Sequence, residues 1–467
     1  MAATLRILAL EPYFGGQHAD FLEALRTRSR HRWTLLAMPA RNWKWRMRGG
    51  AMHLAREAAT LLPRAAKDRV GAEHPPYGAK VRVGAEHPPY GAKDRAGAEH
   101  PPYGAKDRVG AEHPPYGAKV RVGAEHPPYG ARVRAGAEHP PYGGKDRTTG
   151  AAPFDLIFAS DLLNVAEFRA LAPPPLGRLP VVTYFHENQL CLPLEPGPSR
   201  ATRSSEKRVD PQWGFVNLVS ALASTEVWFN SAFHRDAFHG AVRALLAKMP
   251  DFVPPDLVET LAARSRVMPP GVNLKPFAEC RRRPRGKPPL TILWNHRWES
   301  DKDPEAFFEV LFLLAEEGTD FRLAVVGEAL RKWPPVFEKA RRVLADRLVQ
   351  FGYIRQREAY ERQVGQADIA VSTALHEFFG LPIVEAIAAG CFPLMPARLS
   401  YPEIVPAEFQ ETFFYRDERE LRAKLKALLK GKGPWDRAAQ LAEHVQQYDW
   451  DTQMGRYDEA LERAAET

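Results

Sequence analysis

Short apolar runs alternate with longer amphipathic segments along most of the chain. In the N-terminal half, the runs rich in aliphatic and aromatic residues are LRILAL (5–10), WTLLAMP (33–39), FDLIFAS (154–160), PVVTYFHE (180–187) and EVWFNS (226–231). In the C-terminal half they are LTILWNHR (290–297), FRLAVVG (321–327), LVQFGYI (348–354), ADIAVST (367–373) and CFPLMP (391–396). Helix-length amphipathic segments such as 304–318 and 381–390 lie between them. This pattern predicts βαβ units, and therefore parallel sheets that are buried on both faces.

The two series of strands and helices predict two domains. A proline-rich basic segment, RRRPRGKPP at 281–289, separates them and is interpreted as a linker. We expect an α/β protein with two Rossmann-like, doubly wound parallel-sheet domains facing across a cleft, at 1–280 and 290–440. Residues 441–467 are expected to form a C-terminal helix that packs back on the first domain. Ligands of such sheets bind beyond the carboxyl ends of the strands.

A tandem repeat interrupts the N-terminal series. From Gly71 to Tyr142 the motif GAEHPPYG recurs six times with a period of 13 residues. Because each copy holds two prolines and two glycines and has no apolar face to bury, it cannot offset the entropy lost on ordering. We therefore predict a disordered inserted spacer over 71–149. A metal site made by the repeated histidines is the less favoured alternative, since flexible turns isolate each of them.

Charge and composition restrict the class of protein only loosely. The chain has 467 residues, with 65 Lys and Arg against 57 Asp and Glu, and its pI is about 9.3. This excess suits an anionic partner such as a nucleotide, a nucleic acid or a membrane surface. The three cysteines have no metal-ligand spacing, and the N-terminus lacks the features of a signal peptide. No apolar stretch is long enough to span a bilayer, so we predict a cytoplasmic protein without stable membrane association. The sequence does not indicate an oligomeric state.

The segment RNWKWRMRGG at 41–50 alternates cations with flat aromatic rings. Such a stretch can contact nucleic-acid phosphates and stack on unpaired bases. It can equally be the start of an amphipathic helix with its tryptophans in the core. Trp43 and Trp45 are two positions apart and cannot share one helix face, so at least one is expected to point outward. The candidate RNA-binding residues are Arg41, Trp43, Lys44, Trp45, Arg46 and Arg48.

Two strand ends of the N-terminal half carry candidate site residues. Gly15 and Gly16 follow the first apolar run, where they permit a ligand to approach the backbone next to a helix start. A simple tight turn explains them as well. His186 follows the fourth run and is a candidate hydrogen-bond donor or acid–base group. The alternative is a structural histidine, which is the commoner case at a strand end.

The strand end at Asn295–Arg297 in the C-terminal half gives a sharper signal. Lys302 follows Arg297 by five residues at a strand-to-helix junction. An arginine fork and a lysine point charge can together hold a diphosphate. Asp301 and Asp303 form a D-x-D pair, which we interpret as capping the next helix rather than binding a metal.

A pair of glutamates frames a second anion-binding element, in HEFFGLPIVEAIAAG (376–390). Glu377 lies in the loop after a predicted strand, and Glu385 lies on the helix that begins at Leu381–Pro382. Proline suits the first helical turn, where its missing N–H needs no partner. The backbone amides around Phe379, Gly380 and Leu381 would then face an anion in the cleft.

Together these C-terminal motifs resemble those of retaining, nucleotide-sugar-dependent glycosyltransferases of family 4, which have the GT-B fold. The matching features are the Arg297–Lys302 pair, the VVGE turn at 325–328, the FGYI strand end and the two glutamates eight residues apart. The N-terminal half resembles one subgroup, the tRNA-queuosine mannosyltransferases. The resemblance is carried by EPYFGGQHADF (11–21), MPARNWKWRMRGGAMHLA (38–55), FDLIFASDLLNVAEF (154–168), YFHENQL (184–190) and QWGFVNLVSALAS (212–224).

The resemblance implies a reaction and assigns roles to residues. Mannose would pass from GDP-mannose to queuosine in the anticodon of a tRNA for aspartate, with retention of configuration. Arg297 and Lys302 would hold the donor diphosphate, Glu377 hydroxyls of the transferred sugar, and Glu385 the ribose. Tyr353 and Ile354 would flank the base, and His186 would lie near the transferred sugar. No metal or further cofactor is expected. The alternatives are a lipid or glycan acceptor, and a catalytically inactive GT-B scaffold that binds RNA.

Overall fold

The computed structural model describes residues 4–63, 153–191, 211–281, 289–328 and 333–467. The two sheets discussed below belong to the unit formed by residues 1–70 and 150–467. The predictions for the repeat at 71–149 and for most of the linker at 281–289 lie outside the described residues.

The first sheet has six parallel strands in the order β2-β1-β3-β4-β5-β6. Its strands are β1 (Arg6–Phe14), β2 (Arg32–Pro39), β3 (Leu156–Ser160), β4 (Val181–Phe185), β5 (Glu226–Phe229) and β6 (Ser265–Val267). The strand order reverses direction at β1. Strands β2 and β3 both pair with it in parallel, and Ile7–Leu10 of β1 take part in both pairings. The carboxyl ends of β1 and β3 therefore lie next to one another at this switch point.

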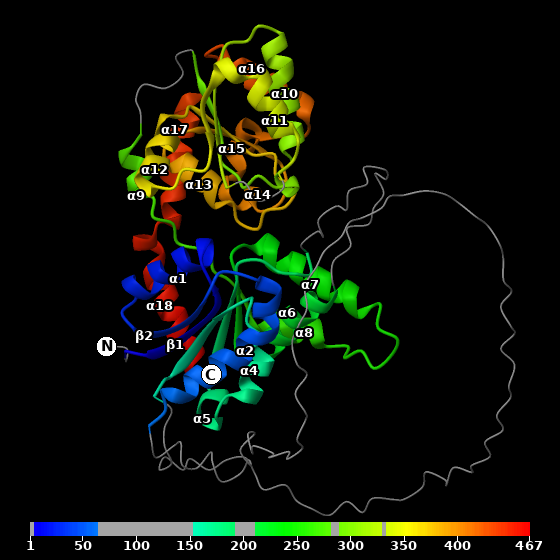
Figure 1. Cartoon of the computed structure of the whole chain (residues 1–467), viewed down its shortest axis with the longest axis vertical. Coiled ribbons are helices and arrows are strands. Elements are labelled where there is room, and N and C mark those ends of the chain that lie inside the picture. Colours follow the sequence, from blue (N-terminus) through cyan, green and yellow to red (C-terminus); the bar gives the residue numbers. More distant parts are fainter. Residues whose placement is uncertain (1–3, 64–152, 192–210, 282–288, 329–332) are drawn as a thin grey trace, which may run out of the picture. The chain divides into compact units, whose positions relative to one another are not determined.

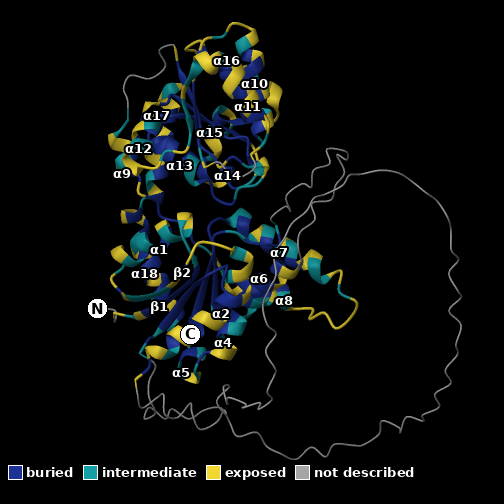
Figure 2. Cartoon of the chain, viewed as in Figure 1, coloured by how far each residue is buried: buried dark blue, intermediate teal, exposed yellow. Residues whose placement is uncertain are grey.

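Helices cover both faces of the first sheet, which explains why its strands are almost wholly apolar. The helices in this part of the chain are α1 (Gly16–Arg28), α2 (Trp43–Thr60), α4 (Val165–Leu171), α5 (Pro174–Gly177), α6 (Pro211–Ala223), α7 (Ala232–Leu246), α8 (Leu257–Arg264) and α9 (Lys275–Glu279). One core cluster joins alternate residues of β1 and β3 to α2 and α4. A second cluster joins the intervening residues to α1 and to the last helix of the chain. Figure 2 shows these strands as buried.

The second sheet also has six parallel strands, in the order β12-β11-β10-β7-β8-β9. Its strands are β7 (Thr291–Trp294), β8 (Arg322–Val326), β9 (Leu348–Gly352), β10 (Ile369–Val371), β11 (Phe392–Pro396) and β12 (Phe414–Tyr415). Counted from β7, this is the 3-2-1-4-5-6 order of a dinucleotide-binding sheet. The switch point lies between β7 and β10, which pair directly.

The helices around the second sheet complete its core. They are η1 (Ser300–Lys302), α10 (Pro304–Glu316), α11 (Val336–Val343), η2 (Ala345–Arg347), α12 (Arg357–Gln366), α13 (Leu381–Ala388), α14 (Tyr401–Ile404), α15 (Ala407–Phe413), α16 (Glu418–Leu429), α17 (Trp435–His444) and η3 (Val445–Tyr448). The last helix, α18 (Trp450–Glu466), packs on the first sheet instead. Figure 1 shows α10, α11 and α16 beside this sheet. Asp303 caps α10 by accepting a hydrogen bond from the Ala306 N–H at 3.3 Å, which confirms the capping interpretation for Asp303. The Asp301 carboxylate instead lies 3.2 Å from the Lys302 ammonium.

The C-terminal segment differs from the single helix expected over 441–467. It is divided into α17, η3 and α18, and Asp449 caps α18 with its side chain. The break occurs because Asp449 is extended at φ −62° and ψ 143° and pairs with Val272 in a parallel bridge. The last helix packs on the first sheet, where Trp450 and Tyr457 join the core of β1, β3 and β4. The C-terminal segment therefore runs from helices around the second sheet to a helix that packs on the first sheet.

Candidate functional site

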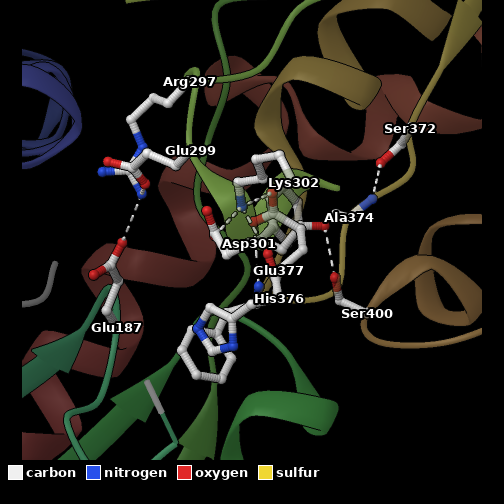
Figure 3. A network of polar contacts seen from close by, with 12 residues as sticks. Glu187, Arg297, Glu299, Asp301, Lys302, Ser372, Ala374, His376, Glu377 and Ser400 are labelled. Carbon is white, nitrogen blue, oxygen red and sulfur yellow. Dashed lines mark hydrogen bonds and ion pairs between the residues drawn. The ribbon is translucent and has the colours of Figure 1, made fainter. Parts of the chain in front are cut away.

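The switch point of the second sheet brings together the loops that follow β7 and β10. Lys302 ends the 3-10 turn after β7, and only 8% of its side chain is exposed. Its ammonium donates to the His376 carbonyl at 2.7 Å and lies 3.4 Å from Oε2 of Glu377 and 3.2 Å from Oδ2 of Asp301. Figure 3 shows this cation between the two carboxylates. The structure thus joins two of the predicted site residues directly.

These buried charges stabilise each other. Burial alone would lower the pKa of Lys302, but the carboxylates of Glu377 and Asp301 outweigh it and raise that pKa. Burial would likewise raise the pKa of Glu377, yet the charge of Lys302 holds it below the usual range. Both groups are therefore charged at neutral pH, which gives the site a fixed ammonium and a fixed carboxylate side by side.

Arg297 is held more loosely than Lys302. Its side chain is 52% exposed and lies 3.6 Å from Oε1 of Glu187 and 3.5 Å from Oε2 of Glu299. Both distances exceed a normal hydrogen bond, so its fork of donors remains able to take an anion. Nearby carboxylates, including Glu377, raise the pKa of Arg297 against the effect of burial. The two cations of the predicted clamp therefore belong to one electrostatic network (Figure 3).

Helix α13 begins beside this network. Gly380 takes a left-handed conformation with φ 100°, and a Cβ there would lie 3.0 Å from the ring of Tyr401. Only glycine suits this position without strain. Phe379 is buried, with its carbonyl accepting from the Ser400 hydroxyl at 2.9 Å, and Leu381 starts the helix. The turn that the sequence predicted as an anion-binding helix start is thus fixed in position by packing.

Glu385 lies one turn into α13, in a polar cluster that the sequence motifs did not indicate. Its two carboxylate oxygens accept from the Arg357 guanidinium and from the Tyr360 hydroxyl, each at 2.7 Å. Asn295, two residues before Arg297, donates to Tyr360 at 3.1 Å and to the Pro382 carbonyl at 3.0 Å. This amide connects the strand end of β7 to the helix that carries Glu385. Arg357 and Tyr360 are three residues apart and so share one face of α12, and this spacing was the sequence feature that could have indicated them.

The residues predicted to flank a base follow the edge strand β9. Tyr353 is 62% exposed, whereas Ile354 is half-buried against the core of the second sheet. The VVGE turn ends β8, and a Cβ on Gly327 would collide with the carbonyl of His296. That turn therefore needs glycine because the two strand ends approach closely. Among the described residues, neither Tyr353 nor Ile354 forms a hydrogen bond or ion pair with Lys302 or Glu377.

The switch point of the first sheet holds the predicted glycines together with a buried histidine pair. Gly16 begins α1 with φ 51°. His186, directly after β4, is 4% exposed, and its ring centroid lies 4.3 Å from that of His18. The backbone N–H of His186 donates to Oδ1 of Asp161 at 3.1 Å. Burial and the charge of His18 keep the pKa of His186 well below its usual range, so its ring is neutral.

His18 is a site residue that the sequence reasoning missed. Its Nδ1 lies 3.2 Å from Oε2 of Glu11, whose other oxygen accepts from the Ser160 hydroxyl at 3.0 Å. Burial would lower the pKa of His18, but the charge and hydrogen bond of Glu11 prevail and raise it to about 9. His18 is therefore an imidazolium at neutral pH. A glutamate inside the apolar run of β1 was the available signal.

We predict that Glu11→Gln lowers the pKa of His18 from about 9 to below its ordinary value of 6.5. Burial then acts without its compensating carboxylate. Because the folded pKa is raised in the parent protein, His18 stabilises it below pH 6.5, and this contribution disappears as the pH rises through 9. The variant should lack that decline. Histidine NMR titration and urea unfolding at several pH values measure both effects, and an unaltered pKa would contradict the pairing.

The basic and aromatic stretch forms the start of α2. Trp43 is half-buried, packs in a small cluster with Met47, and lies 5.8 Å from the ring centroid of Trp213. Trp45 is 59% exposed and lies over Gly49, where a Cβ would be 2.8 Å from its ring. The expectation that at least one of the two tryptophans points outward is confirmed. One ring packs in the protein, and the other is presented to solvent.

The cations of this stretch flank the two tryptophans in sequence, and the Lys44 ammonium lies 5.6 Å from the ring centroid of Trp43. Arg41, Lys44 and Arg48 are exposed, and Arg46 donates to the Pro39 carbonyl at 3.3 Å. The Arg48 guanidinium lies 5.4 Å from the ring centroid of Trp213. The structure thus gathers these predicted residues on one helix start. Within the described part of the chain, no hydrogen bond or ion pair joins them to His186, Lys302 or Glu377.

Comparisons with known proteins identify both halves of the chain. Residues 6–68 and 131–272 match the family described as tRNA-queuosine alpha-mannosyltransferase N-terminal, and residues 279–448 match glycosyl transferases group 1. The tRNA-queuosine alpha-mannosyltransferase of Drosophila melanogaster is 35% identical over 262 residues, which cover 55% of this chain and 67% of that protein. The chain belongs to the tRNA-queuosine alpha-mannosyltransferase family. The gap between the two matched N-terminal segments falls almost entirely in the repeat.

Membership of this family makes the chain a glycosyltransferase, and its two Rossmann-like sheets make it a GT-B protein, as the sequence predicted. A GDP-mannose:cellobiosyl-diphosphopolyprenol alpha-mannosyltransferase of Xanthomonas oryzae is 26% identical over 53% of this chain and 65% of that protein. Among solved structures, Anabaena HepE in complex with UDP has a TM-score of 0.48 and 16% identity, covering 66% of this chain and 79% of HepE.

Two structural features are absent from the described residues. None of the helices there is long and apolar enough to cross a membrane. The same residues contain no group of three or more His, Cys, Asp or Glu side chains that could hold a metal ion.

Proposed function

We propose that the protein transfers mannose from GDP-mannose to queuosine in the anticodon of a tRNA for aspartate, with retention of configuration. The observation that carries the donor half of this proposal is the buried Lys302–Glu377 pair at the switch point, with Arg297 in the same network. The acceptor half is supported by the family match of the N-terminal segments. A tRNA acceptor would place the enzyme in the cytoplasm.

The donor would bind across the carboxyl ends of β7 and β10. Arg297 would take up the diphosphate with its fork and Lys302 with its point charge, assisted by the backbone amides at Phe379, Gly380 and Leu381. Glu377 would bind hydroxyls of the mannose. In the same proposal Glu385, already held by Arg357 and Tyr360, would bind the ribose, and Tyr353 and Ile354 would flank the base.

Catalysis would rest on electrostatic stabilisation and positioning. As the bond between mannose and the diphosphate breaks, negative charge grows on the leaving GDP, and Arg297 and Lys302 neutralise it. Their charges are set in place beforehand, so little reorganisation is needed at that moment. Attack by the acceptor hydroxyl from the same face, with its proton passing to an oxygen of the departing diphosphate, would then give retention without a protein nucleophile. His186, neutral and next to the His18 imidazolium, would lie near the transferred sugar.

The acceptor tRNA would contact the start of α2. Arg41, Lys44, Arg46 and Arg48 would meet phosphates, while Trp45 would stack on an unpaired anticodon base. Trp43 would support the helix from within, since it packs beside Trp213.

We predict that Trp45→Ala weakens tRNA binding about tenfold or more, because stacking on one base contributes ~1–3 kcal/mol. The free energy of unfolding of the Trp45→Ala variant should change by no more than about 0.5 kcal/mol, since the ring is exposed. Trp43→Ala should instead lower stability. Binding at fixed salt and urea unfolding measure the two effects. Trp333→Ala, at an exposed tryptophan of the C-terminal half, is the matched control and should leave tRNA binding unchanged.

The decisive experiment incubates the protein with labelled GDP-mannose and tRNA that contains or lacks queuosine, followed by nucleoside analysis. Label should appear only in queuosine. The lipid-linked acceptor in the name of the Xanthomonas relative makes a polyprenyl-diphosphate saccharide the second candidate, to be supplied in a parallel reaction. Label on the lipid would select that alternative. RNA binding with neither transfer nor donor hydrolysis would select an inactive scaffold.

A further inference from the structure

The site between the two switch points contains more negative than positive side chains. One electrostatic network connects the carboxylates and cations of both sheets. Within the described residues its carboxylates are Glu11, Asp161, Glu187, Glu299, Asp301 and Glu377, and its cations are His18, Arg297 and Lys302. On the proposed function, the donor diphosphate would also engage Arg297 and Lys302. The carboxylates nearest the acceptor side would then lose much of their compensation.

Glu187 is the carboxylate whose cationic partner would be most affected when a donor diphosphate binds Arg297. It follows His186 at the end of β4, and its side chain is 38% exposed. Its contact with Arg297 is 3.6 Å, which is longer than a hydrogen bond, and Figure 3 shows it reaching toward that guanidinium. A diphosphate that bound Arg297 would compete for the same donors, so Glu187 would become available to another cation.

Asp161 gives an independent indication that a cation is missing. It is 1% exposed, and among the described residues its Oδ2 has no hydrogen-bond partner. Glu187 and Glu11 both act on it electrostatically, and burial together with these charges raises its pKa to about 7 despite His18. An unpartnered buried carboxylate oxygen is costly unless a ligand or ion compensates it. The same ligand would lower that pKa and favour the ionised form.

We propose that Glu187 is a specificity-determining residue that binds a protonated amine of the acceptor, with Asp161 supplying supporting negative charge. This inference rests on the proposed function, because queuosine carries a secondary amine beside its hydroxyl-bearing cyclopentene ring. A carboxylate near the transferred sugar would therefore meet that amine when the hydroxyl is in position. When Arg297 binds the donor diphosphate, it no longer compensates the charge of Glu187, and the ammonium of the acceptor takes its place. An unmodified guanine at the same position offers no such cation.

The test compares two tRNAs that differ at a single substituent, which is cationic in one and neutral in the other. One carries 7-aminomethyl-7-deazaguanine, which has an ammonium, and the other carries 7-cyano-7-deazaguanine, which is neutral, at the position of queuosine. Binding to the full chain is measured at fixed salt with saturating GDP, so that Arg297 is engaged. We expect the parent protein to bind the aminomethyl tRNA about tenfold more tightly than the cyano tRNA, because one charged hydrogen bond contributes binding free energy of about that size. Equal binding of the two tRNAs would overturn the proposal.

Three variants locate the effect. Glu187→Gln should reduce the preference to near unity, and Asp161→Asn should reduce it in part. Glu299→Gln is the matched control, because Glu299 contacts Arg297 at 3.5 Å but follows β7 of the other sheet. It should keep the tenfold preference. If Glu299→Gln lost it as fully as Glu187→Gln, Glu187 would be only a counter-ion of Arg297. Absence of mannose transfer by the parent protein would reject the proposed function separately, since the preference is measured by binding alone.

Discussion

Replacing Lys302 with methionine is expected to lower the rate of mannose transfer by about 10²–10³-fold, the range for removing one preorganised charge-stabilising group. The ammonium is the buried cation of the proposed diphosphate site, and solvent cannot take its place there. The loss should appear in single-turnover rates at saturating donor. It would therefore reflect the transition state rather than weaker binding alone.

The same substitution should also destabilise the fold. Methionine leaves the largely buried carboxylates of Glu377 and Asp301 without their counter-charge. Removing one partner of a buried ion pair lowers the free energy of unfolding by about 3–5 kcal/mol. Lys339→Met is the matched control, since Lys339 pairs with Glu309 at 2.9 Å on the exposed surface. The Lys339→Met variant should keep the parent transfer rate, and its free energy of unfolding should differ from that of the parent by no more than about 0.5 kcal/mol.

Replacing Arg297 with alanine is expected to lower transfer at least about tenfold, and up to about 10²-fold, with little effect on stability. The guanidinium is half exposed, and its ion pairs with Glu187 and Glu299 are long, so the fold does not depend on it. Single-turnover transfer and thermal unfolding measure the two effects. Arg297→Lys should recover only part of the rate, because a point charge cannot reproduce the two-pronged contact of arginine with a diphosphate.

The contrast between the two variants tests the donor assignment. Lys302→Met should lose both rate and stability, whereas Arg297→Ala should lose rate alone. Unchanged transfer in Arg297→Ala would remove the diphosphate role from this residue. A stability loss in that variant equal to the loss in Lys302→Met would mean that the pairs with Glu187 and Glu299 are structural.

Several local features followed from the sequence because their causes are local. The apolar runs became the strands of two parallel sheets, since a strand covered on both faces excludes polar residues. Asp303 caps α10, and Gly380 precedes α13 in the left-handed conformation that glycine favours. The outward ring of Trp45 followed from helix periodicity. Each of these features depends on a few neighbouring residues.

Features that depend on distant residues were missed. Arg357 and Tyr360 bind Glu385 from a helix 28 and 25 residues away in sequence, and no motif linked them. His18 and Asp161 are further examples, because their charges are set by partners on other strands. The division of the C-terminal segment at Asp449 was also missed, since it arises from pairing with Val272.

The sequence by itself determined the fold class, the family and the residue types at the strand ends, because periodicity, glycines and charged motifs are written along the chain. Only the tertiary structure decided which strand ends are neighbours. The order β10-β7 in one sheet and β1-β3 in the other places residues far apart in sequence side by side, and burial then sets their charges. Electrostatic coupling depends on distance in space and on exclusion of water, and neither quantity can be read from spacing along the chain.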